Sequence, residues 1–424
     1  MLQSIIEEND RRQAIIHAKF NPISGQGSVG ERTLVHIPDF PIPDQWLPNP
    51  MLKNKTIRLL RQAGTIQAFT AQLFPDNPDH ELARLRVIDM LVRIRCRHDF
   101  PFWAATYVHI KNKELDGTPE ILFRLSYPQR KFVEVLEHYR TSRLPIRIVL
   151  LKARQWGGST TSQLYMAWLQ LTHRKGLNSL IIAHQGTASD EIKDMFDRMM
   201  RSYPLDMLHD LGDTFNENEP KMTRVGNSGS IFEIPQRKCK IKIGTAERPD
   251  SSRGGDYALV HLSEVGLWKE TEGKKPRDIV RAACGGVLYR PDTMIVYEST
   301  ANGHGNFFHN EYTDARDNPK SQFRHLFIPW FDIDWNIIPF PDDDARRQFA
   351  KNLYENREQR TAPSNREEPG RYLWSLWEKG ATLEGLNWYI AERGKHTSHG
   401  SFAAECPSDD IEAFVNTGAA VLFC

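Results

Sequence analysis

A segment at residues 151–160 combines the residue types that bind phosphate. It reads Leu-Lys-Ala-Arg-Gln-Trp-Gly-Gly-Ser-Thr, and it joins a predicted buried strand to a predicted helix. At such a junction the backbone N–H groups of the turn and the positive end of the helix dipole both point at an anion. The phosphate-loop (Walker A) pattern, GxxxxGK followed by Ser or Thr, aligns Gly157 with its second glycine and Ser159 with its Mg²⁺-binding hydroxyl. The segment therefore predicts a site for nucleotide phosphates and Mg²⁺.

Two positions of this segment depart from the pattern. Lys152 stands where the first glycine is expected, and Gly158 stands where the lysine is expected. Lys152 or Arg154 could still reach the phosphates, because the chemistry requires a cation near the transition state rather than at one sequence position. A glycine-rich turn with only a structural role is the alternative. The predicted phosphate-binding residues are Lys152, Arg154, Gln155, Gly157, Gly158, Ser159 and Thr160.

A second segment, residues 257–264, reads as a hydrophobic strand with a polar end. In the ASCE class of P-loop ATPases such a strand ends in Asp-Glu, where the aspartate supports Mg²⁺ through water and the glutamate polarises the attacking water. Here Ser263 and Glu264 take these places. We expect Glu264 to be catalytic and Ser263 to orient a metal-bound water more weakly than a carboxylate would. The alternative is a buried strand that ends at an exposed glutamate.

A third segment, residues 294–303, is an apolar strand that ends in small and hydroxyl-bearing residues. Ser299, Thr300 and Asn302 could sense the γ-phosphate and pass its loss to a moving element, although an ordinary strand-to-turn exit has the same composition. Parallel strands would bring all three segments to one edge of a sheet, and this convergence strengthens the joint interpretation.

Tyr127 and Gln129 precede the phosphate segment, at the start of a predicted helix. The glutamine amide offers a donor and an acceptor that suit the edge of adenine, and the tyrosine ring could stack on the base. The alternative is that the tripeptide at 127–129 only begins the helix.

The surrounding pattern predicts the elements that position these residues. Apolar runs alternate with helical patterns, which favours an α/β fold of the P-loop (ASCE) type with a mostly parallel sheet flanked by helices. Residues 238–243 alternate lysines with apolar residues, as a strand with one basic face does. The predicted strands are residues 146–151, 179–183, 258–262 and 294–298, and the predicted helices are 130–140, 159–173 and 189–201. We divide the chain into an N-terminal arm and helical region (1–115), the ATPase core (116–330) and a small, mostly helical lid or linker subdomain (331–424).

Two charged regions outside the core have mainly structural interpretations. Residues 80–98 form a predicted helix, and its arginines form a solvated face or, alternatively, one that contacts phosphates. The residues expected to pack in the core are Leu82, Leu85, Ile88, Leu91 and Val92. The acidic residues at 332, 334 and 342–344 are expected to be solvated or to cap helices.

The proline-rich segment at 36–50 is expected to stay outside regular helix and central strand.

Composition limits the possible functions. The 424 residues carry 55 Lys+Arg and 54 Asp+Glu, a net charge of +1, so the chain cannot hold nucleic acid by bulk charge. No apolar run approaches the ~18–20 residues that cross a bilayer, and the polar N-terminal residues do not resemble a secretory signal. Five scattered cysteines without zinc spacing are expected to be reduced thiols.

In their order and spacing, these segments resemble the ATPase half of the large terminase subunit of tailed bacteriophages. The resemblance covers roughly residues 100–424 and includes further matches at 252–254, 327–330 and 402–414. A phosphate loop whose basic residue has moved to the front is a known variant in that family. It would account for Lys152 and Arg154.

The resemblance implies an ATP-hydrolysing motor that translocates double-stranded DNA through a portal protein into a preformed capsid. It implies a homo-oligomeric ring on the portal, a small terminase subunit as partner, and action in the cytoplasm of the bacterial host rather than in the mature virion. By the family pattern Gln129 contacts adenine, and Lys152 and Arg154 contact the phosphates of ATP. Ser159 binds Mg²⁺, with Ser263 in the aspartate's place, Glu264 is catalytic, and Ser299, Thr300 and Asn302 couple hydrolysis to movement. Arg253 would act on a neighbouring subunit's nucleotide.

Gly158 and Ser263 depart from the family pattern and leave metal affinity and turnover open. The family usually adds an RNase H-like nuclease domain. This chain ends at Cys424, about where that domain would begin, so we expect no nuclease activity in it and a cutter supplied by a continuing gene or a separate protein. The alternatives are a helicase-like DNA-dependent ATPase, which needs a second RecA-like domain, and a degenerate nucleotide-binding scaffold.

Overall fold

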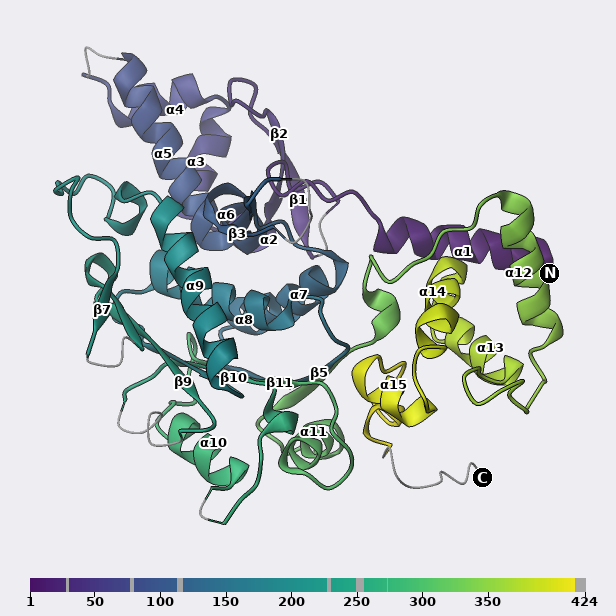
Figure 1. Cartoon of the computed structure of the whole chain (residues 1–424). Helices are drawn as coiled ribbons and strands as arrows, with labels where there is room; N and C mark the ends of the chain where they lie inside the picture. The colour runs from purple at the N-terminus through teal and green to yellow at the C-terminus, as the bar shows by residue number, and fades with distance from the viewer. Residues whose placement is uncertain are drawn as a thin grey trace.

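An eight-stranded sheet forms the centre of the computed structural model, which describes residues 1–27, 30–76, 80–112, 117–226, 230–248, 255–272 and 274–415 (Figure 1). The strand order is β12-β5-β11-β10-β6-β9-β8-β7. The strands from β12 to β9 are parallel, and β8 and β7 extend the sheet antiparallel. The strands are β5 (Ile146–Lys152), β6 (Ser179–Ala183), β7 (Thr223–Val225), β8 (Ile231–Ile234), β9 (Cys239–Thr245), β10 (Leu259–Ser263), β11 (Met294–Ser299) and β12 (Arg324–Ile328). The predicted α/β class and mostly parallel sheet are confirmed.

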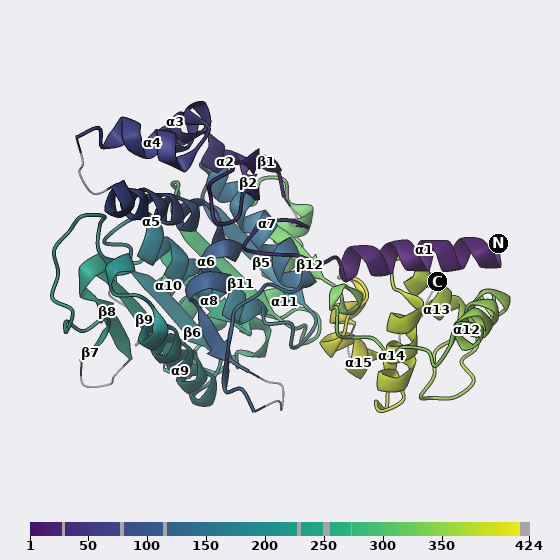
Figure 2. The ribbon, with the colours of Figure 1, turned by 90° about the horizontal axis from the view of Figure 1, so that it is seen from above.

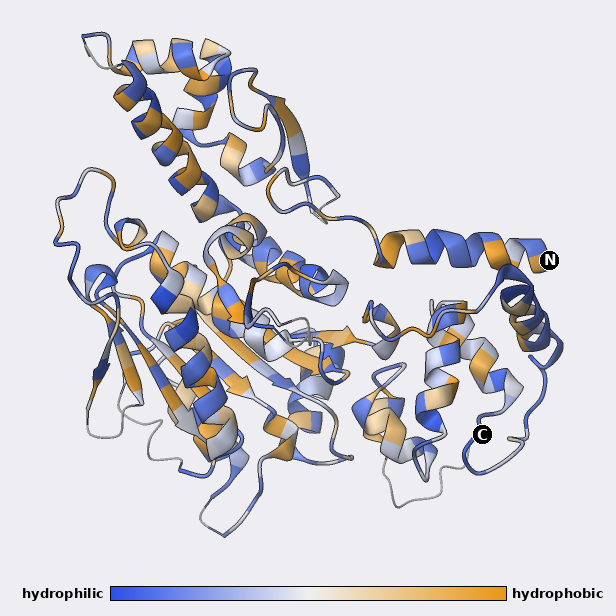
Figure 3. Cartoon of the chain, turned by 45° about the horizontal axis from the view of Figure 1, so that its top comes forward, coloured by the Kyte–Doolittle hydropathy of each residue, from blue (hydrophilic) through white to orange (hydrophobic). Residues whose placement is uncertain are grey.

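Helices cover both faces of this sheet (Figures 1 and 2). α7 (Tyr127–Thr141), α8 (Gly158–Trp168) and α9 (Gly186–Ser202) pack on one face, and α10 (Pro276–Cys284) and α11 (Phe307–Asp317) pack on the other. Along β5, Ile148 and Leu150 enter the larger core, whereas Val149 and Leu151 enter the core beneath α10 and α11. Because both faces are buried, the strand is a continuous apolar run. Figure 3 shows hydrophobic residues concentrated along the central strands.

The N-terminal part has a separate small core. β1 and β2 pair with each other and not with the central sheet, so the proline-rich segment stays outside that sheet, as expected. The expectation that it also stays outside regular helix is wrong at its end, because Asn49 and Pro50 begin a short helix. The elements are β1 (Arg32–His36), β2 (Asp44–Pro48), α2 (Asn49–Leu52), α3 (Lys55–Ala63), α4 (Ile66–Leu73), α5 (His80–His98), α6 (Phe100–Tyr107), β3 (His109–Lys111) and β4 (Glu120–Leu122).

The predicted packing face of α5 is only partly right, because Leu91 is buried and Ile88 and Val92 pack partly buried as expected, but the first two leucines do not. Leu82 and Leu85 are 44% and 54% exposed, whereas the buried stripe runs through Ala83, Val87 and Leu91. The stripe continues through Arg95, which is 4% exposed, because its guanidinium pairs with buried Asp99 at 3.3 Å. A sequence pattern that assigns every arginine to solvent cannot place this face.

The C-terminal helices form a group beside the sheet that also contains α1 (Figures 1 and 2). The group consists of α1 (Leu2–Ile16), α12 (Asp343–Glu355), α13 (Gly370–Glu378), α14 (Leu383–Arg393) and α15 (His399–Glu405). The Asn9 side chain accepts a hydrogen bond from the Leu383 amide at 2.7 Å, and Arg12 donates to the Trp377 carbonyl at 2.6 Å. The first helix of the chain therefore packs on the last ones. Domain boundaries at 115 and 330 stay predictions.

The acidic residues of this part fall into two kinds. Asp342 caps α12 by accepting from the Ala345 amide at 2.7 Å, as expected. Asp332 is instead buried, and it pairs with Lys131 at 2.5 Å. Among the described residues, no helix has the length and apolar content needed to span a membrane.

Removing the Asp99 carboxylate should destabilise the fold. Asp99 is fully buried and lies 2.7 Å from Arg32 and 3.3 Å from Arg95, so Asp99→Ala leaves two largely buried cations without their partner. We expect a loss of about 3–5 kcal/mol, measured by urea unfolding. Asp278→Ala, which breaks an exposed pair with Arg281, should cost no more than about 1 kcal/mol. Equal losses in the two variants would contradict the expectation.

Candidate functional site

The carboxyl ends of β5, β11 and β10 lie side by side at one edge of the sheet. Leu151 is in register with Ser299, and Glu298 is in register with Ser263. Both pairings are parallel, so the three segments that the sequence selected meet at this edge. The turn at 153–157 and the start of α8 complete it.

Lys152, the last residue of β5, lies between two carboxylates. Its Nζ is 2.7 Å from Glu264 Oε1 and 3.0 Å from Glu298 Oε2, and its side chain is only 7% exposed. Burial would lower the pKa of Lys152, but the charges of Glu298 and Glu264 outweigh it and raise that pKa above its ordinary value. Lys152 is therefore a protonated cation held at the end of β5, next to the turn at 153–157.

Glu298 gathers the two hydroxyls that the sequence assigned to Mg²⁺. Its Oε1 accepts a hydrogen bond from Ser159 Oγ at 2.6 Å and one from Ser263 Oγ at 2.7 Å. Nε2 of His261 lies 3.5 Å from the same oxygen, and the glutamate is fully buried. Burial would raise the pKa of Glu298, but the charge of Lys152 together with the contacts of His261 and Ser159 outweighs burial and lowers that pKa, so the side chain is ionised.

The motifs in the sequence do not select Glu298. The available signal was a glutamate inside an otherwise apolar strand, since a carboxylate in such a place needs a partner. His261 is likewise outside the predicted site residues, although it sits in the equally apolar strand β10.

The turn before α8 is shaped by two left-handed residues. Gln155 has φ 69° and Gly157 has φ 79°. A Cβ on Gly157 would lie 2.6 Å from Nε2 of Gln129, so glycine is required there for its φ and for space. Gln155 is exposed, and Thr160 is half-buried in the first turn of α8.

Trp156 explains the absence of lysine at position 158. The indole is buried and packs edge-on against Phe132 of α7, with ring centroids 6.1 Å apart. A Cβ on Gly158 would lie 2.7 Å from Cζ2 of this ring. Any side chain at 158 would collide with the indole, and the nearby buried cation is Lys152 instead.

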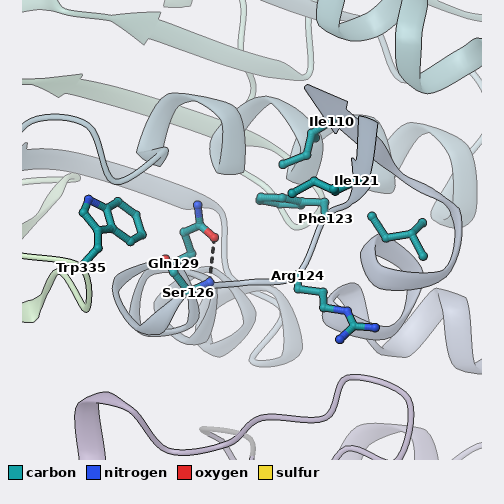
Figure 4. A pocket seen from close by; sticks show the side chains of 8 residues that line it. Ile110, Ile121, Phe123, Arg124, Ser126, Gln129 and Trp335 are labelled. Atoms are coloured by element: carbon teal, nitrogen blue, oxygen red, sulfur yellow. Dashed lines mark hydrogen bonds between the residues drawn. The ribbon is translucent and has the colours of Figure 1, made fainter. Parts of the chain in front are cut away.

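Gln129 links the turn to a cavity. Its Oε1 accepts from the Ser126 amide at 2.9 Å, and its Nε2 donates to the Trp156 carbonyl at 2.9 Å. It also lines a cavity of about 490 Å³ (Figure 4). The other lining residues are Ile110, Ile121, Leu122, Phe123, Arg124, Ser126 and Trp335. Tyr127 does not line it; its ring lies 5.8 Å from the Arg130 guanidinium.

Glu264 contacts the predicted coupling residues. It has φ 52°, and its Oε2 accepts from the Thr300 amide at 3.2 Å and from Ser299 Oγ at 3.4 Å. Ser299 Oγ accepts from the Gly266 amide at 3.0 Å, and the Asn302 side chain donates to the Gly266 carbonyl at 2.9 Å. The end of β11 is thus bonded directly to residues 264–266.

Arg154 is directed toward α15. Its guanidinium lies 2.7 Å from Glu405 Oε2, and its amide donates to the Glu405 carbonyl at 3.0 Å. The hydrogen bond that Arg154 donates to Glu405 raises the pKa of Arg154. No local sequence signal marks this partner, because it lies in a distant helix.

The remaining basic candidates are scattered. On β9, Lys240 is exposed and Lys242 is half-buried, and Lys238 precedes the strand. On α5, Arg93 pairs with Asp89 and Asp206, so its charge is compensated within the chain. The proposed trans-acting residue, Arg253, lies outside the described residues.

No family model matches the chain, and no curated protein sequence matches it. Solved structures similar to it include the large terminase ATPase domain of Thermus phage P74-26, with 17% identity over 57% of this chain and 98% of that chain and a TM-score of 0.32. The large terminase of bacteriophage HK97 has 12% identity over 65% of this chain and 57% of its own, with a TM-score of 0.43. A large terminase from another thermophilic bacteriophage has 14% identity, coverage of 55% of this chain and 51% of its own, and a TM-score of 0.36. These structural neighbours belong to the family that the sequence motifs resemble.

Gly157→Ala should lower the free energy of unfolding by more than the penalty for placing an alanine at a positive φ. Gly64 has φ 80°, and a Cβ added to it would meet no atom within 4 Å, so Gly64→Ala is a matched control that carries only the left-handed penalty of roughly 1–2 kcal/mol. Gly157→Ala carries the same penalty and also displaces Gln129. In a Gln129→Ala background the surplus should vanish, which a double-mutant cycle by urea unfolding measures. If Gly157→Ala costs the same stability with glutamine and with alanine at position 129, the contact between residues 157 and 129 does not contribute to stability.

Proposed function

We propose that this chain hydrolyses ATP and is the motor subunit of a bacteriophage terminase that translocates double-stranded DNA. The observation that carries the ATPase proposal is the placement of Lys152. It is a buried cation at the end of a strand, beside a phosphate-type turn, and it contacts the predicted catalytic Glu264 at 2.7 Å. A P-loop ATPase needs a cation for the phosphates and a carboxylate for water at this edge of its sheet.

The turn and α8 would bind the phosphates. The free N–H groups at the start of α8 and the helix dipole favour an anion there. Lys152 would move from its carboxylates to the β- and γ-phosphates, which releases Glu264 to polarise the attacking water. Mg²⁺, when bound, would neutralise negative charge on the phosphates. The Ser159 and Ser263 hydroxyls would hold it, since oxygen donors suit this hard cation.

The cavity beside Gln129 is the proposed place for the base. Phe123 and Trp335 offer aromatic surface, and the amide of Gln129 keeps one N–H and one lone pair for the edge of adenine. Gln129 also holds the Trp156 carbonyl, so base binding and the shape of the phosphate turn depend on one side chain. In this arrangement Trp335, rather than Tyr127, is the ring placed to stack on the base.

Hydrolysis would reach the rest of the molecule through the Glu264 contacts. Ser299, Thr300 and Asn302 bond to Glu264 or Gly266, so a rotation of the Glu264 side chain changes the end of β11 and the segment that leads to α11. This is the proposed coupling route.

The DNA-packaging role rests on the order and spacing of the sequence motifs. It implies double-stranded DNA, a portal protein and a small terminase subunit as partners, and a homo-oligomeric ring in the cytoplasm of the infected host. A degenerate scaffold was an alternative because of Gly158 and Ser263. Gly158 removes the expected lysine, and Ser263 removes the expected carboxylate. Lys152 supplies a cation and Glu298 supplies a carboxylate close to these positions, which favours a hydrolase.

Glu264→Gln should abolish hydrolysis and preserve nucleotide binding. The amide keeps the size of the side chain but is a poor base, so we expect the phosphate-release rate to fall about 10²–10⁴-fold. The double variant Lys152→Ala, Arg154→Ala should lose binding as well. Steady-state phosphate release with and without double-stranded DNA, and binding of a fluorescent ATP analogue, measure both effects.

Glu233→Gln is the control, since this residue of β8 lies near Lys240 and outside the site. Unchanged hydrolysis in Glu264→Gln would remove the catalytic assignment. Tight ATP binding by the wild type without phosphate release would favour the scaffold. Release that DNA does not stimulate would argue against the motor role.

Glu405→Gln should strengthen ATP binding slightly. Arg154 must leave Glu405 to reach the phosphates, and an exposed ion pair of this kind is worth about 0.2–1 kcal/mol. We expect the dissociation constant for a non-hydrolysable ATP analogue to fall roughly 1.5- to 5-fold. Glu392→Gln, which loses a surface pair with Lys395, should leave it unchanged. Weaker binding in Glu405→Gln would mean that Arg154 works from its present position.

A further inference from the structure

We infer that Glu298 supplies the carboxylate of the divalent-cation site, in place of the acidic residue that β10 lacks at Ser263. The inference rests on the proposed ATPase function and adds a residue to it. It changes the expected source of the carboxylate from β10 to the neighbouring strand β11.

The sheet register makes this exchange geometrically possible. Ser263 and Glu298 are Cα partners on adjacent parallel strands, so a longer side chain from β11 can reach the space beside the short one on β10. Ser159 Oγ, from the first turn of α8, and Ser263 Oγ both donate to Glu298 Oε1, at 2.6 and 2.7 Å. Three oxygen-bearing side chains from three elements therefore converge on one point.

These donors fit a hard cation. Mg²⁺ is usually held by one or two carboxylates, hydroxyls and waters, together with substrate phosphates. Ser159 is the hydroxyl that the phosphate-loop pattern assigns to the metal, and its contact is Glu298 rather than Glu264. A metal-bound water could replace either hydroxyl as the donor to Glu298. Nitrogen and sulfur ligands that would favour zinc are not part of this convergence, apart from His261 at 3.5 Å.

Charge balance links the cation to Lys152. In the present arrangement Lys152 neutralises Glu298 at 3.0 Å and Glu264 at 2.7 Å. When Lys152 moves to the phosphates, a fully buried carboxylate would be left without a counter-charge, which is unfavourable. A divalent cation beside Glu298 would restore the balance. Release of the lysine and binding of the metal would then favour each other.

A purely structural role for Glu298 is the competing explanation. A counter-ion for Lys152 is already present in Glu264, and buried ion pairs generally add little stability over apolar packing. A structural counter-ion would also need donors to its buried second oxygen, but these could come from any element. Here the donors are Ser159 and Ser263, the two hydroxyls that the sequence patterns assign to Mg²⁺. The hydroxyl contacts therefore favour the cation site.

Glu298→Gln tests the assignment, because it keeps the size of the side chain and removes its charge. The probe is Mn²⁺, followed by electron paramagnetic resonance with a saturating non-hydrolysable ATP analogue. We expect the Mn²⁺ concentration for half-saturation to rise at least 10-fold. Binding of the analogue in EDTA should stay equal to that of the wild type or become tighter, since Lys152 loses one competing carboxylate.

Two further variants make the test specific. Ser263→Asp in the Glu298→Gln background moves a carboxylate to the register partner and should recover most of the lost Mn²⁺ affinity. Glu264→Gln should leave the Mn²⁺ midpoint within about 2-fold of the wild type, because Glu264 is assigned to water and not to the metal. Should Glu298→Gln fail to fold, Glu298→Asp is the substitute, because it keeps the charge on a side chain one methylene shorter. It should raise the Mn²⁺ midpoint, but by less than the 10-fold expected for Glu298→Gln.

The possible failures are distinguishable. A folded Glu298→Gln variant with the wild-type Mn²⁺ midpoint overturns this inference and leaves the ATP site intact. An unchanged midpoint in Glu298→Asp, where that variant is needed, does the same. A wild type that binds no nucleotide, with or without Mn²⁺, overturns the proposed function and this inference together.

Discussion

The arrangement of the site depends on one buried cation and its two carboxylates. Lys152, Glu264 and Glu298 bring three charges together, and the buried charges of Lys152 and Glu298 are tolerated only because their partners are held at contact distance. Three parallel strands provide this rigidity. Lys152 ends β5, Glu298 lies one residue before the end of β11, and Glu264 directly follows β10. The register of the sheet therefore fixes the charges, and a slip of one residue would place Glu298 on the opposite face.

The departures at Gly158, in the phosphate-loop pattern, and at Ser263, in the carboxylate-strand pattern, have local structural causes. Trp156 fills the space that a side chain at Gly158 would need, and its ring packs on Phe132. The cation is consequently on the strand, where its backbone is part of the sheet. At Ser263 the hydroxyl is short, and the space beside it holds the Glu298 carboxylate. In both places the chemical group is retained nearby while its sequence position changes.

Sequence patterns predicted the central strands well because strands buried on both faces are continuous apolar runs. The convergence of residues 152, 263 and 299 also followed, since parallel strands end at one edge. Contacts between distant segments could not be predicted in this way. The pairing of Glu405 with Arg154, and the packing of α1 on the C-terminal helices, depend on the tertiary arrangement alone. The face of α5 was misplaced because Arg95 is buried with Asp99, and no local pattern marks a buried arginine. The roles of the site residues stay predictions.

The two predicted phosphate cations differ in how strongly the protein holds them, and on the proposed function this difference would set the order of events at the site. Arg154 and Glu405 have side chains that are 51% and 43% exposed, so water and salt screen their attraction and a bound phosphate can compete with it easily. Lys152 is 7% exposed and has two partners, so it would move only when the phosphates attract it and a cation compensates the buried carboxylate of Glu298. Arg154 would therefore respond first to an approaching nucleotide and loosen the contact between the turn and α15. Lys152 would respond only when the phosphates and their cation are seated. On the proposed function, Glu264 would be released only in that second step. The water-polarising group would then become free only after the nucleotide is fully bound, which would protect ATP from hydrolysis in a partly assembled site.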